Sequence, residues 1–300
     1  MTPRRAWSSA APGIVSERRA GNRAAELSYH QSLDDVWWVS AGGAAEHIRA
    51  LSNSAFAPIQ GGSFMARGSG WAGAQARLDF GTIASARIGA SETGRGSALI
   101  WQFAADSRLS DELRVQLSNA RDFQTVSPRS LSLGITRIDT EAQVTYTPDL
   151  LWTGVGLVRD AEFSDGNRLL RAYMAPRRAV LRTQDWNLDL GVSGNWYGYS
   201  IQPPLNGYYA PAFYQQYAAT AYGYYKMSQE DGVSLILSLG AHKDDSMTSF
   251  KFTAGIYTEA TFGLLSDWMW KLRGGYTNNG STAGRNYSAE TVGLTVVRRF

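Results

Sequence analysis

Apolar residues recur at every second position through much of the chain, whereas helical periodicity is hard to find. The cleanest alternation runs from Trp186 to Tyr199, where leucine, valine and tryptophan alternate with asparagine, aspartate, serine and tyrosine. The same pattern recurs in segments 72–80, 140–147, 250–264, 268–277 and 292–300. Because successive side chains of a strand point to opposite faces, this pattern predicts an all-β chain of strands with one apolar and one polar face.

The connections between these segments alternate between short and long. Tight turns are expected at SLDD, near Gly81, and at LSDE, TPD, RTQD, SQEDG and LLSD. Longer loops are expected at 52–62, 121–138, IQPPLNGYYAPAF, HKDDSMTS and TNNGSTAGR, and shorter ones at SETGRG and FSDGN. Outer-membrane barrels have short periplasmic turns and longer external loops. With a first strand within Trp7–Arg19, residues 1–300 are predicted to form one antiparallel transmembrane β-barrel of about sixteen strands with both termini periplasmic. Residues 1–22 hold either that strand or a linker.

Aromatic residues gather where the tight turns lead into strands. Such positions are typical of the aromatic girdle at a membrane interface. They are Trp37, Trp38, Trp152, Trp186, Trp268 and Trp270. Many positions on the other face are glycine, alanine, serine or charged, which suits a water-filled lumen better than a dry core. A soluble β-sandwich that acts as a binding module is the alternative, because alternation alone is common to both.

Composition excludes several classes of protein. The chain has no cysteine, so it has no disulfide framework and no thiolate zinc site. Its formal net charge of +3 is too small to indicate nucleic-acid binding.

The sequence has no apolar run of about 18 residues, so a transmembrane helix is excluded. Arg4 and Arg5 are not followed by the apolar segment of a signal peptide. If the protein belongs in the outer membrane of a Gram-negative bacterium, we expect this chain to be a fragment or a mis-started reading frame.

Four stretches resemble a known family. They are SPRSLSLGIT (127–136), FSDGNR (163–168), NGYYAPAFYQQYAATAYGYYK (206–226) and the closing segment from EATFGLLSD to VVRRF. In this order they resemble the C-terminal barrels of outer-membrane exopolysaccharide exporters, which include the poly-N-acetylglucosamine porin, the cellulose synthase outer-membrane subunit and the Pel secretin-like partner. The resemblance covers 122–300. The terminal Phe300 after Val292, Leu294 and Val296 also resembles an outer-membrane recognition signal, although Arg298 stands where an aromatic residue is common.

The resemblance implies a pore that exports an exopolysaccharide, with outer-membrane lipid, the polysaccharide chain and periplasmic subunits of a synthase complex as partners. In these families a tetratricopeptide superhelix precedes the barrel, whereas this sequence has no repeat of about 34 residues. A general diffusion porin or a structural barrel remains an alternative function. A barrel hydrolase is another.

Candidate chemistry is sparse. His30, His47 and His242 lie far apart without metal-binding spacing, and no nucleophile elbow or phosphate loop is present. We therefore expect no metal, no cofactor and no enzymatic activity. For a hydrolase, the best candidate is His242 in HKDDSMTS, beside Asp244, Asp245 and Ser246. A solvated polar loop is the favoured interpretation of that segment.

Alternation assigns several charged residues to the lumen. Those expected to face inward are Arg77, Arg87, Arg114, Arg171, Lys271 and Arg273, with Glu141, Asp160, Glu162, Asp189 and Glu259 as counter-charges. Mixed charges favour passage of a hydrated sugar chain that is neutral or weakly cationic. Tyr197 and Tyr199, and the loop aromatics Tyr208, Tyr209 and Tyr214, are candidates for stacking on sugar rings. The loop that contains SPRSLSLGIT is a candidate constriction or plug.

Overall fold

The computed structural model describes residues 13–18, 23–49, 64–78, 81–202, 205–264, 266–282 and 285–298. These residues form sixteen strands and one short helix. The strands are β1 (Gly13–Arg18), β2 (Arg23–Ser32), β3 (Trp37–Arg49), β4 (Phe64–Arg77), β5 (Ile83–Thr93), β6 (Gly96–Arg108), β7 (Leu113–Phe123), β8 (Thr136–Tyr146), β9 (Trp152–Phe163), β10 (Arg168–Arg182), β11 (Trp186–Tyr199), β12 (Tyr214–Lys226), β13 (Gly232–Asp244), β14 (Lys251–Phe262), β15 (Trp268–Thr282) and β16 (Arg285–Arg298). The helix α1 (Pro128–Ser132) lies between β7 and β8.

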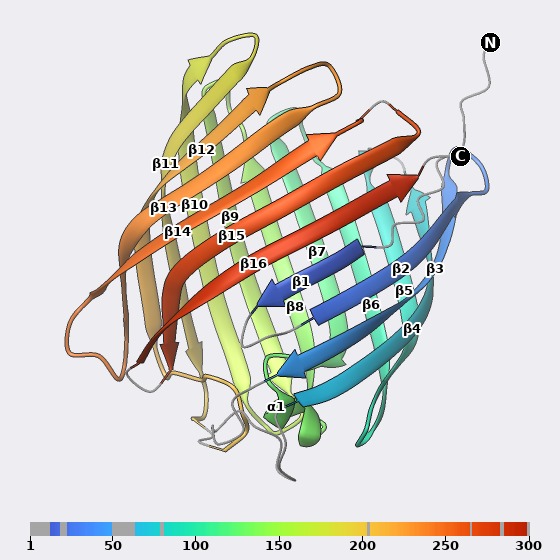
Figure 1. Cartoon of the computed structure of the whole chain (residues 1–300), viewed down its shortest axis with the longest axis vertical. Coiled ribbons are helices and arrows are strands. Elements are labelled where there is room, and N and C mark those ends of the chain that lie inside the picture. Colours follow the sequence, from blue (N-terminus) through green and yellow to red (C-terminus); the bar gives the residue numbers. More distant parts are fainter. Residues whose placement is uncertain are drawn as a thin grey trace.

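Each strand pairs antiparallel with its neighbours in sequence, and β1 also pairs with β16, so the sheet closes into a barrel (Figure 1). This confirms the all-β antiparallel barrel of about sixteen strands. Strand β1 falls within the predicted first strand, Trp7–Arg19. The remainder of that segment lies outside the described residues. In the part of the chain that the structure describes, no helix is long and apolar enough to cross a membrane.

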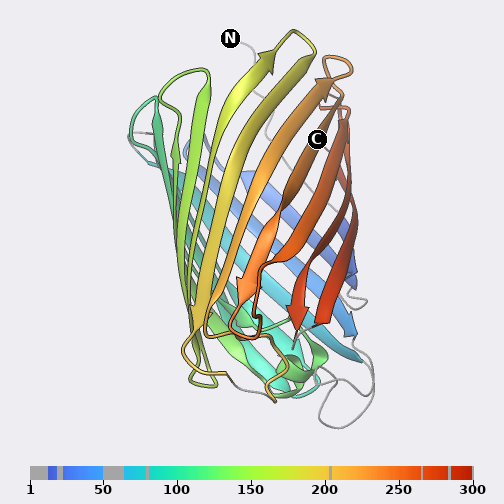
Figure 2. The same cartoon turned by 90° about the vertical axis from the view of Figure 1, so that its left-hand side faces the viewer.

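The two ends of the barrel differ, as Figures 1 and 2 show. One end, here called the tight-turn end, carries the short connections after β2, β4, β6, β8, β10, β12 and β14, and β1 begins and β16 ends there. The opposite end, called the loop end, carries α1 and the connection 200–213. The long connections predicted at 121–138 and at IQPPLNGYYAPAF lie at the loop end, but the β5–β6 connection there, 94–95, is as short as a tight turn.

A repeated side-chain contact shapes several of the tight turns. An aspartate or threonine oxygen accepts a hydrogen bond from the backbone N–H of the tryptophan three residues later, which starts the next strand. The pairs are Asp34–Trp37, Asp149–Trp152 and Thr183–Trp186, with N···O distances of 2.7, 2.7 and 2.9 Å. Side chains of these types favour turns because they bond their own backbone a few residues on.

Two predicted loops are shorter than expected. The segment TNNGSTAGR is largely strand, because β15 and β16 remain paired as far as Thr282 and Arg285, with a register shift between Thr277 and Gly280. Strand β13 likewise continues to Asp244, into the segment HKDDSMTS. Towards the loop end both faces of a hairpin can be polar, so strands there lack the apolar alternation by which they are recognised.

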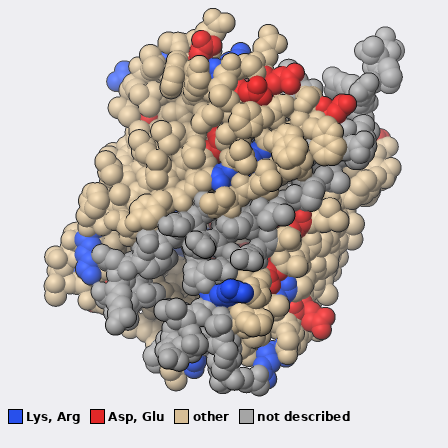
Figure 3. All heavy atoms as spheres, in the orientation of Figure 1, with Lys and Arg blue, Asp and Glu red and all other residues tan. Residues whose placement is uncertain are grey.

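The apolar face of the sheet points outward. Large apolar side chains such as Val192, Leu239 and Phe252 are more than half exposed. Figure 3 shows a broad area of uncharged side chains on one side of the molecule. On the other face, Arg67 of β4 forms an ion pair with Asp122 of β7, the third strand along, and only the concave side brings such distant strands within reach. The charged face therefore lines the lumen.

Aromatic side chains mark both margins of the outer face. At the tight-turn end, Trp152, Trp186 and Trp268 are exposed, and Trp186 stacks on Tyr225. Trp38 instead faces inward, beneath the guanidinium of Arg77. Nearer the loop end, the Trp196 indole N–H donates to the Tyr217 hydroxyl at 3.0 Å. Indole and phenol groups suit a membrane interface because one edge is apolar and the other is hydrated.

A substitution at Leu239, which is 59% exposed, tests whether the apolar face of the sheet contacts lipid. We expect Leu239→Arg to lower the free energy of unfolding by about 2–4 kcal/mol, because it puts a charge into hydrocarbon. Ser238→Arg is the matched control, since its side chain would enter the hydrated lumen, and it should change stability much less. Urea unfolding in lipid vesicles, followed by tryptophan fluorescence, measures both. Equal losses would contradict the assigned faces.

Candidate functional site

The lumen wall carries basic and acidic side chains that neutralise one another across neighbouring strands. The predicted Arg114 on β7 bonds Asp106 on β6, with an Nε···Oδ1 distance of 2.7 Å. The same carboxylate accepts a hydrogen bond from Gln116, whose own amide oxygen accepts one from Gln143 on β8. A continuous polar row thus crosses three strands, and its polar side chains favour a hydrated wall.

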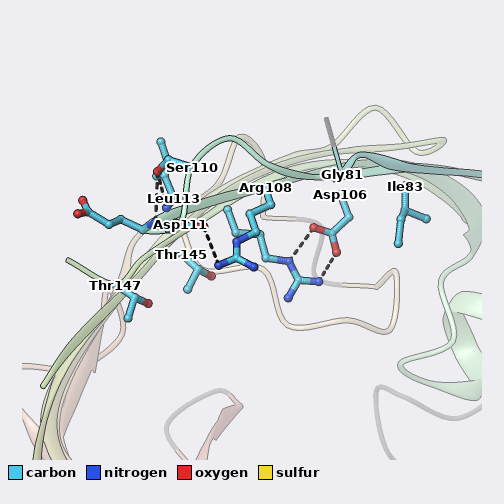
Figure 4. A pocket seen from close by; sticks show the side chains of 11 residues that line it. Gly81, Ile83, Asp106, Arg108, Ser110, Asp111, Leu113, Thr145 and Thr147 are labelled. Carbon is cyan, nitrogen blue, oxygen red and sulfur yellow. Dashed lines mark hydrogen bonds and ion pairs between the residues drawn. The ribbon is translucent and has the colours of Figure 1, made fainter. Parts of the chain in front are cut away.

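The Asp106–Arg114 pair lines a cavity of about 370 Å³ near the tight-turn end (Figure 4). Thr145 and Thr147 of the neighbouring segment and the turn residues Ser110 and Asp111 complete much of its lining. The cavity is polar on several sides and lies next to the β6–β7 turn. It therefore lies at the tight-turn opening of the lumen.

Farther along the wall, the predicted Glu141 and Arg171 flank a cluster that the sequence did not reveal. Asp139 forms ion pairs with Arg137 at 2.6 Å and with Arg159 at 2.8 Å. Glu141 lies directly opposite Arg159 in the ladder, and Arg171 lies opposite Arg159 on its other side. Arg171 donates to Asn195 through Nε at 2.8 Å.

The other predicted lumen residues occupy the same face. Asp189 forms ion pairs with Arg177 and Arg182, at 3.4 and 2.5 Å. Three strands along the wall, on β14, Glu259 binds Arg273 at 2.6 Å and lies 4.0 Å from Lys271.

Arg77 and Arg87 are held differently, because their guanidinium groups stack on indole rings. The distances to the ring centroids of Trp38 and Trp71 are 5.7 and 5.3 Å.

Two residues predicted as inward-facing counter-charges face outward instead. Asp160 and Glu162 lie in the same cross-strand rows as the outward-facing residues Thr140 and Ile138, so they are on the outer face near the loop end. Asp160 pairs with Arg168 there. Leu157 and Val158 are both apolar, so alternation did not identify the inner face of β9, which Arg159 occupies.

An ion-pair cluster around the buried Arg67 at the loop end was missed altogether. Arg67 on β4 binds Glu46 on β3 and Asp122 on β7, and its Nε donates to Ser91 on β5 at 2.8 Å. The signal was present in the sequence, because Met65, Arg67, Ser69 and Trp71 alternate with alanine and glycine. The small outward residues made that strand hard to recognise.

The tyrosines proposed for sugar contact anchor the 200–213 connection inside the loop-end mouth. Tyr208 is 5% exposed, stacks on Phe163 at 5.1 Å between ring centroids, and donates its hydroxyl to Asp165 at 2.6 Å. Tyr214 begins β12 instead of lying in a loop; it is 4% exposed and stacks on Tyr197 at 4.4 Å.

The remaining aromatics belong to the same layer. Tyr199 packs against the cluster that contains Tyr208, and the Tyr209 hydroxyl binds Asp244. As packed here, Tyr208 and Tyr214 have almost no surface to offer a sugar ring, which corrects the expectation for these two residues.

Helix α1 meets this connection across the mouth. Leu131 is fully buried against Ile48 of β3 and Phe123 of β7, both on the lumen side, so α1 lies inside the barrel opening (Figures 1 and 2). On its other side, Ser127 donates to the carbonyl of Gly207 and Arg129 to that of Leu205. Together α1 and the described residues 200–202 and 205–213 form what we call the mouth bridge.

Gly207 is required where the two parts of the bridge touch. Its φ of +77° is in the left-handed region, and a Cβ there would lie 2.5 Å from Arg129 Cβ. Glycine alone avoids both the backbone strain and the overlap.

His242 lies on β13 and faces the lumen, not in a solvated loop as predicted. It is fully buried against Tyr214, with 5.8 Å between ring centroids. Among the described residues neither of its ring nitrogens has a hydrogen-bond partner, and Ser246 donates to Asp244 instead. These residues therefore do not form the serine–histidine contact that a hydrolase needs. In the described part of the chain, no group of three His, Asp or Glu side chains could hold a metal ion.

Comparison with known proteins gives a fold. No protein-family model matches the sequence, and a search of curated proteins finds no match. A bacterial polysaccharide outer membrane secretin has a solved structure that is similar, with a TM-score of 0.80 and 14% identity over 100% of both chains. CdiB from Acinetobacter baumannii is more distant, with a TM-score of 0.56 and 7% identity over 100% of this chain and 61% of that one. The fold is that of an outer-membrane β-barrel.

Tyr208 gives a prediction about the mouth bridge. Burial, aided by the bond to Asp165, raises the pKa of its hydroxyl above the ordinary value of 10.0. The folded protein therefore retains this proton longer than the unfolded chain, so the stabilisation is complete below pH 10 and declines as the pH rises further. Tyr208→Phe should cost about 1–3 kcal/mol below pH 10 and remove that part of the decline. Urea unfolding on both sides of pH 10 tests it; an unchanged slope in the variant would contradict it.

Proposed function

We propose that the chain is an outer-membrane pore through which a polysaccharide leaves the periplasm. The inner wall carries this proposal, because it is lined with Arg–carboxylate pairs and amides instead of a packed apolar core. Paired charges keep water in the lumen while leaving little net field to hold or repel a neutral chain. Passage would involve no covalent chemistry.

The similarity to a polysaccharide outer membrane secretin supports the same function by its fold. The resemblance of 122–300 to exopolysaccharide exporters agrees with it. The tight-turn end would face the periplasm, as in other outer-membrane barrels. Periplasmic subunits of a synthase complex would then meet the barrel at that end, where the polar cavity beside Asp106 opens.

The mouth bridge acts as a gate in this proposal. Helix α1 rests on the wall of β3 and β7, and 200–213 is anchored by Tyr208 on the turn after β9. The contacts between them are few and polar, so they can separate at low cost. The bridge would shut the external mouth until the growing chain pushes the two segments apart.

Conductance in planar lipid bilayers tests the gate. We expect Gly207→Ala to raise the fraction of time spent open, because the added Cβ would overlap Arg129 and Ser127. Gly81→Ala is the matched control: its φ of +70° imposes comparable backbone strain of about 1–3 kcal/mol, no atom lies within 4 Å of its added Cβ, and it lies in the tight turn after β4, away from the bridge. Equal currents from the two variants would remove the gate from the proposal.

The same recordings test the substrate. Chitin-type or cellulose-type oligosaccharides added to the open variant should interrupt the ion current. Current without interruption would point to a general diffusion porin, and no current from any variant would overturn the pore.

A further inference from the structure

A recess in the lumen wall lies next to the mouth bridge, on its side towards the tight-turn end. It has a volume of about 200 Å³, and its lining includes Glu26, Glu46, Arg67, Trp71, Arg87 and Asp122. Ile48 and Phe123, on which α1 rests, follow Glu46 and Asp122 on the same two strands. A sugar chain that reached the closed bridge would therefore lie against this recess.

The back of the recess is rigid. The Arg67 side chain is 8% exposed and is fixed by Ser91, Glu46 and Asp122 from three other strands. This guanidinium holds both carboxylates in place. A carboxylate has room for about four hydrogen bonds, so each retains acceptor capacity towards the lumen.

A flat aromatic platform lies beside these carboxylates. The Trp71 indole covers Gly42 on β3, where a Cβ would lie 2.6 Å from Trp71 Cζ2, so the ring lies close against the wall. The Arg87 guanidinium stacks over the same ring. Among the described residues Arg87 forms no hydrogen bond or ion pair with a carboxylate, so its N–H groups remain for a ligand.

These groups match one uncharged sugar ring. A pyranose has an apolar C–H face that can pack on the planar stack of Arg87 and Trp71, and hydroxyl groups around its edge that donate to carboxylates. The cavity is small beside pockets for drug-sized ligands, which hold about 300–1,000 Å³, so it suits a single ring. The lining has three carboxylates against two guanidiniums, which disfavours an anionic sugar.

We propose that this recess is a binding subsite for one uncharged pyranose unit of the transported polysaccharide. Trp71 and Arg87 support the ring and its substituents, and Glu46 and Asp122 accept hydrogen bonds from its hydroxyls. The subsite rests on the proposed function, since the pore supplies its ligand.

Calorimetric titration of the full chain in detergent micelles tests the subsite. The probes are a tetrasaccharide of N-acetylglucosamine, a tetrasaccharide of glucose and, as the anionic comparison, a tetrasaccharide of galacturonate. At least one neutral probe should bind, and the galacturonate probe should bind more weakly. Trp71→Ala should weaken binding of the neutral probe about tenfold, while Trp71→Phe, which keeps a ring, should weaken it less.

Trp38→Ala is the control, because Trp38 also lies in the lumen beneath an arginine but outside the recess. It should bind like the unaltered protein. Unchanged affinity in Trp71→Ala, stronger binding of galacturonate, or no binding of either neutral probe would overturn the subsite.

Bilayer currents of the same variants separate this result from the proposed function. If Trp71→Ala conducts ions and binds sugar with unchanged affinity, the pore is supported and the subsite is contradicted. Trp71-dependent binding without current in any variant would keep the subsite and remove the pore.

Discussion

Backbone hydrogen bonding governs this structure, because hydrocarbon offers no partner for an N–H or C=O group. An open sheet would leave two unpaired edges in lipid, and pairing of β1 with β16 removes both. Closure also fixes the direction of every side chain. The face that turns outward must be apolar, as Val192 and Phe252 are. The inner face is free of that demand and can hold charge.

Sixteen strands enclose more space than side chains can fill, so the interior is hydrated along the wall and obstructed only where segments fold inward. Charges facing such a space are stable when they are paired. The Asp139 cluster and the Glu259–Arg273 pair meet this need from neighbouring strands. At the mouth, α1 and 200–213 bury Leu131 and Tyr208. The obstruction therefore has a small apolar core of its own.

Period-two alternation and turn chemistry were sufficient to predict the barrel, since both are local. Turns such as Asp149–Trp152 are visible as short sequence signals. The interior depends on contacts between distant segments, which no local pattern shows. Tyr208 looked like a free loop aromatic because its partner Asp165 lies far away in sequence. Asp160 was assigned to the wrong face because two adjacent apolar residues, Leu157 and Val158, hid the parity of β9.

Asp122 connects the recess with the mouth bridge. One of its oxygens binds Arg67, and the other accepts the backbone N–H of Phe123 at 2.7 Å. Phe123 packs on Leu131, and the next residue, Gln124, closes the base of the α1 segment by donating to the carbonyl of Ile135 at 2.8 Å. A sugar hydroxyl that bonds Asp122 would thus contact a residue that helps to position Phe123, on which helix α1 of the mouth bridge packs. In the proposed subsite and gate, recognition and closure would both depend on the Asp122 carboxylate at the end of β7, so substitutions there are expected to affect both.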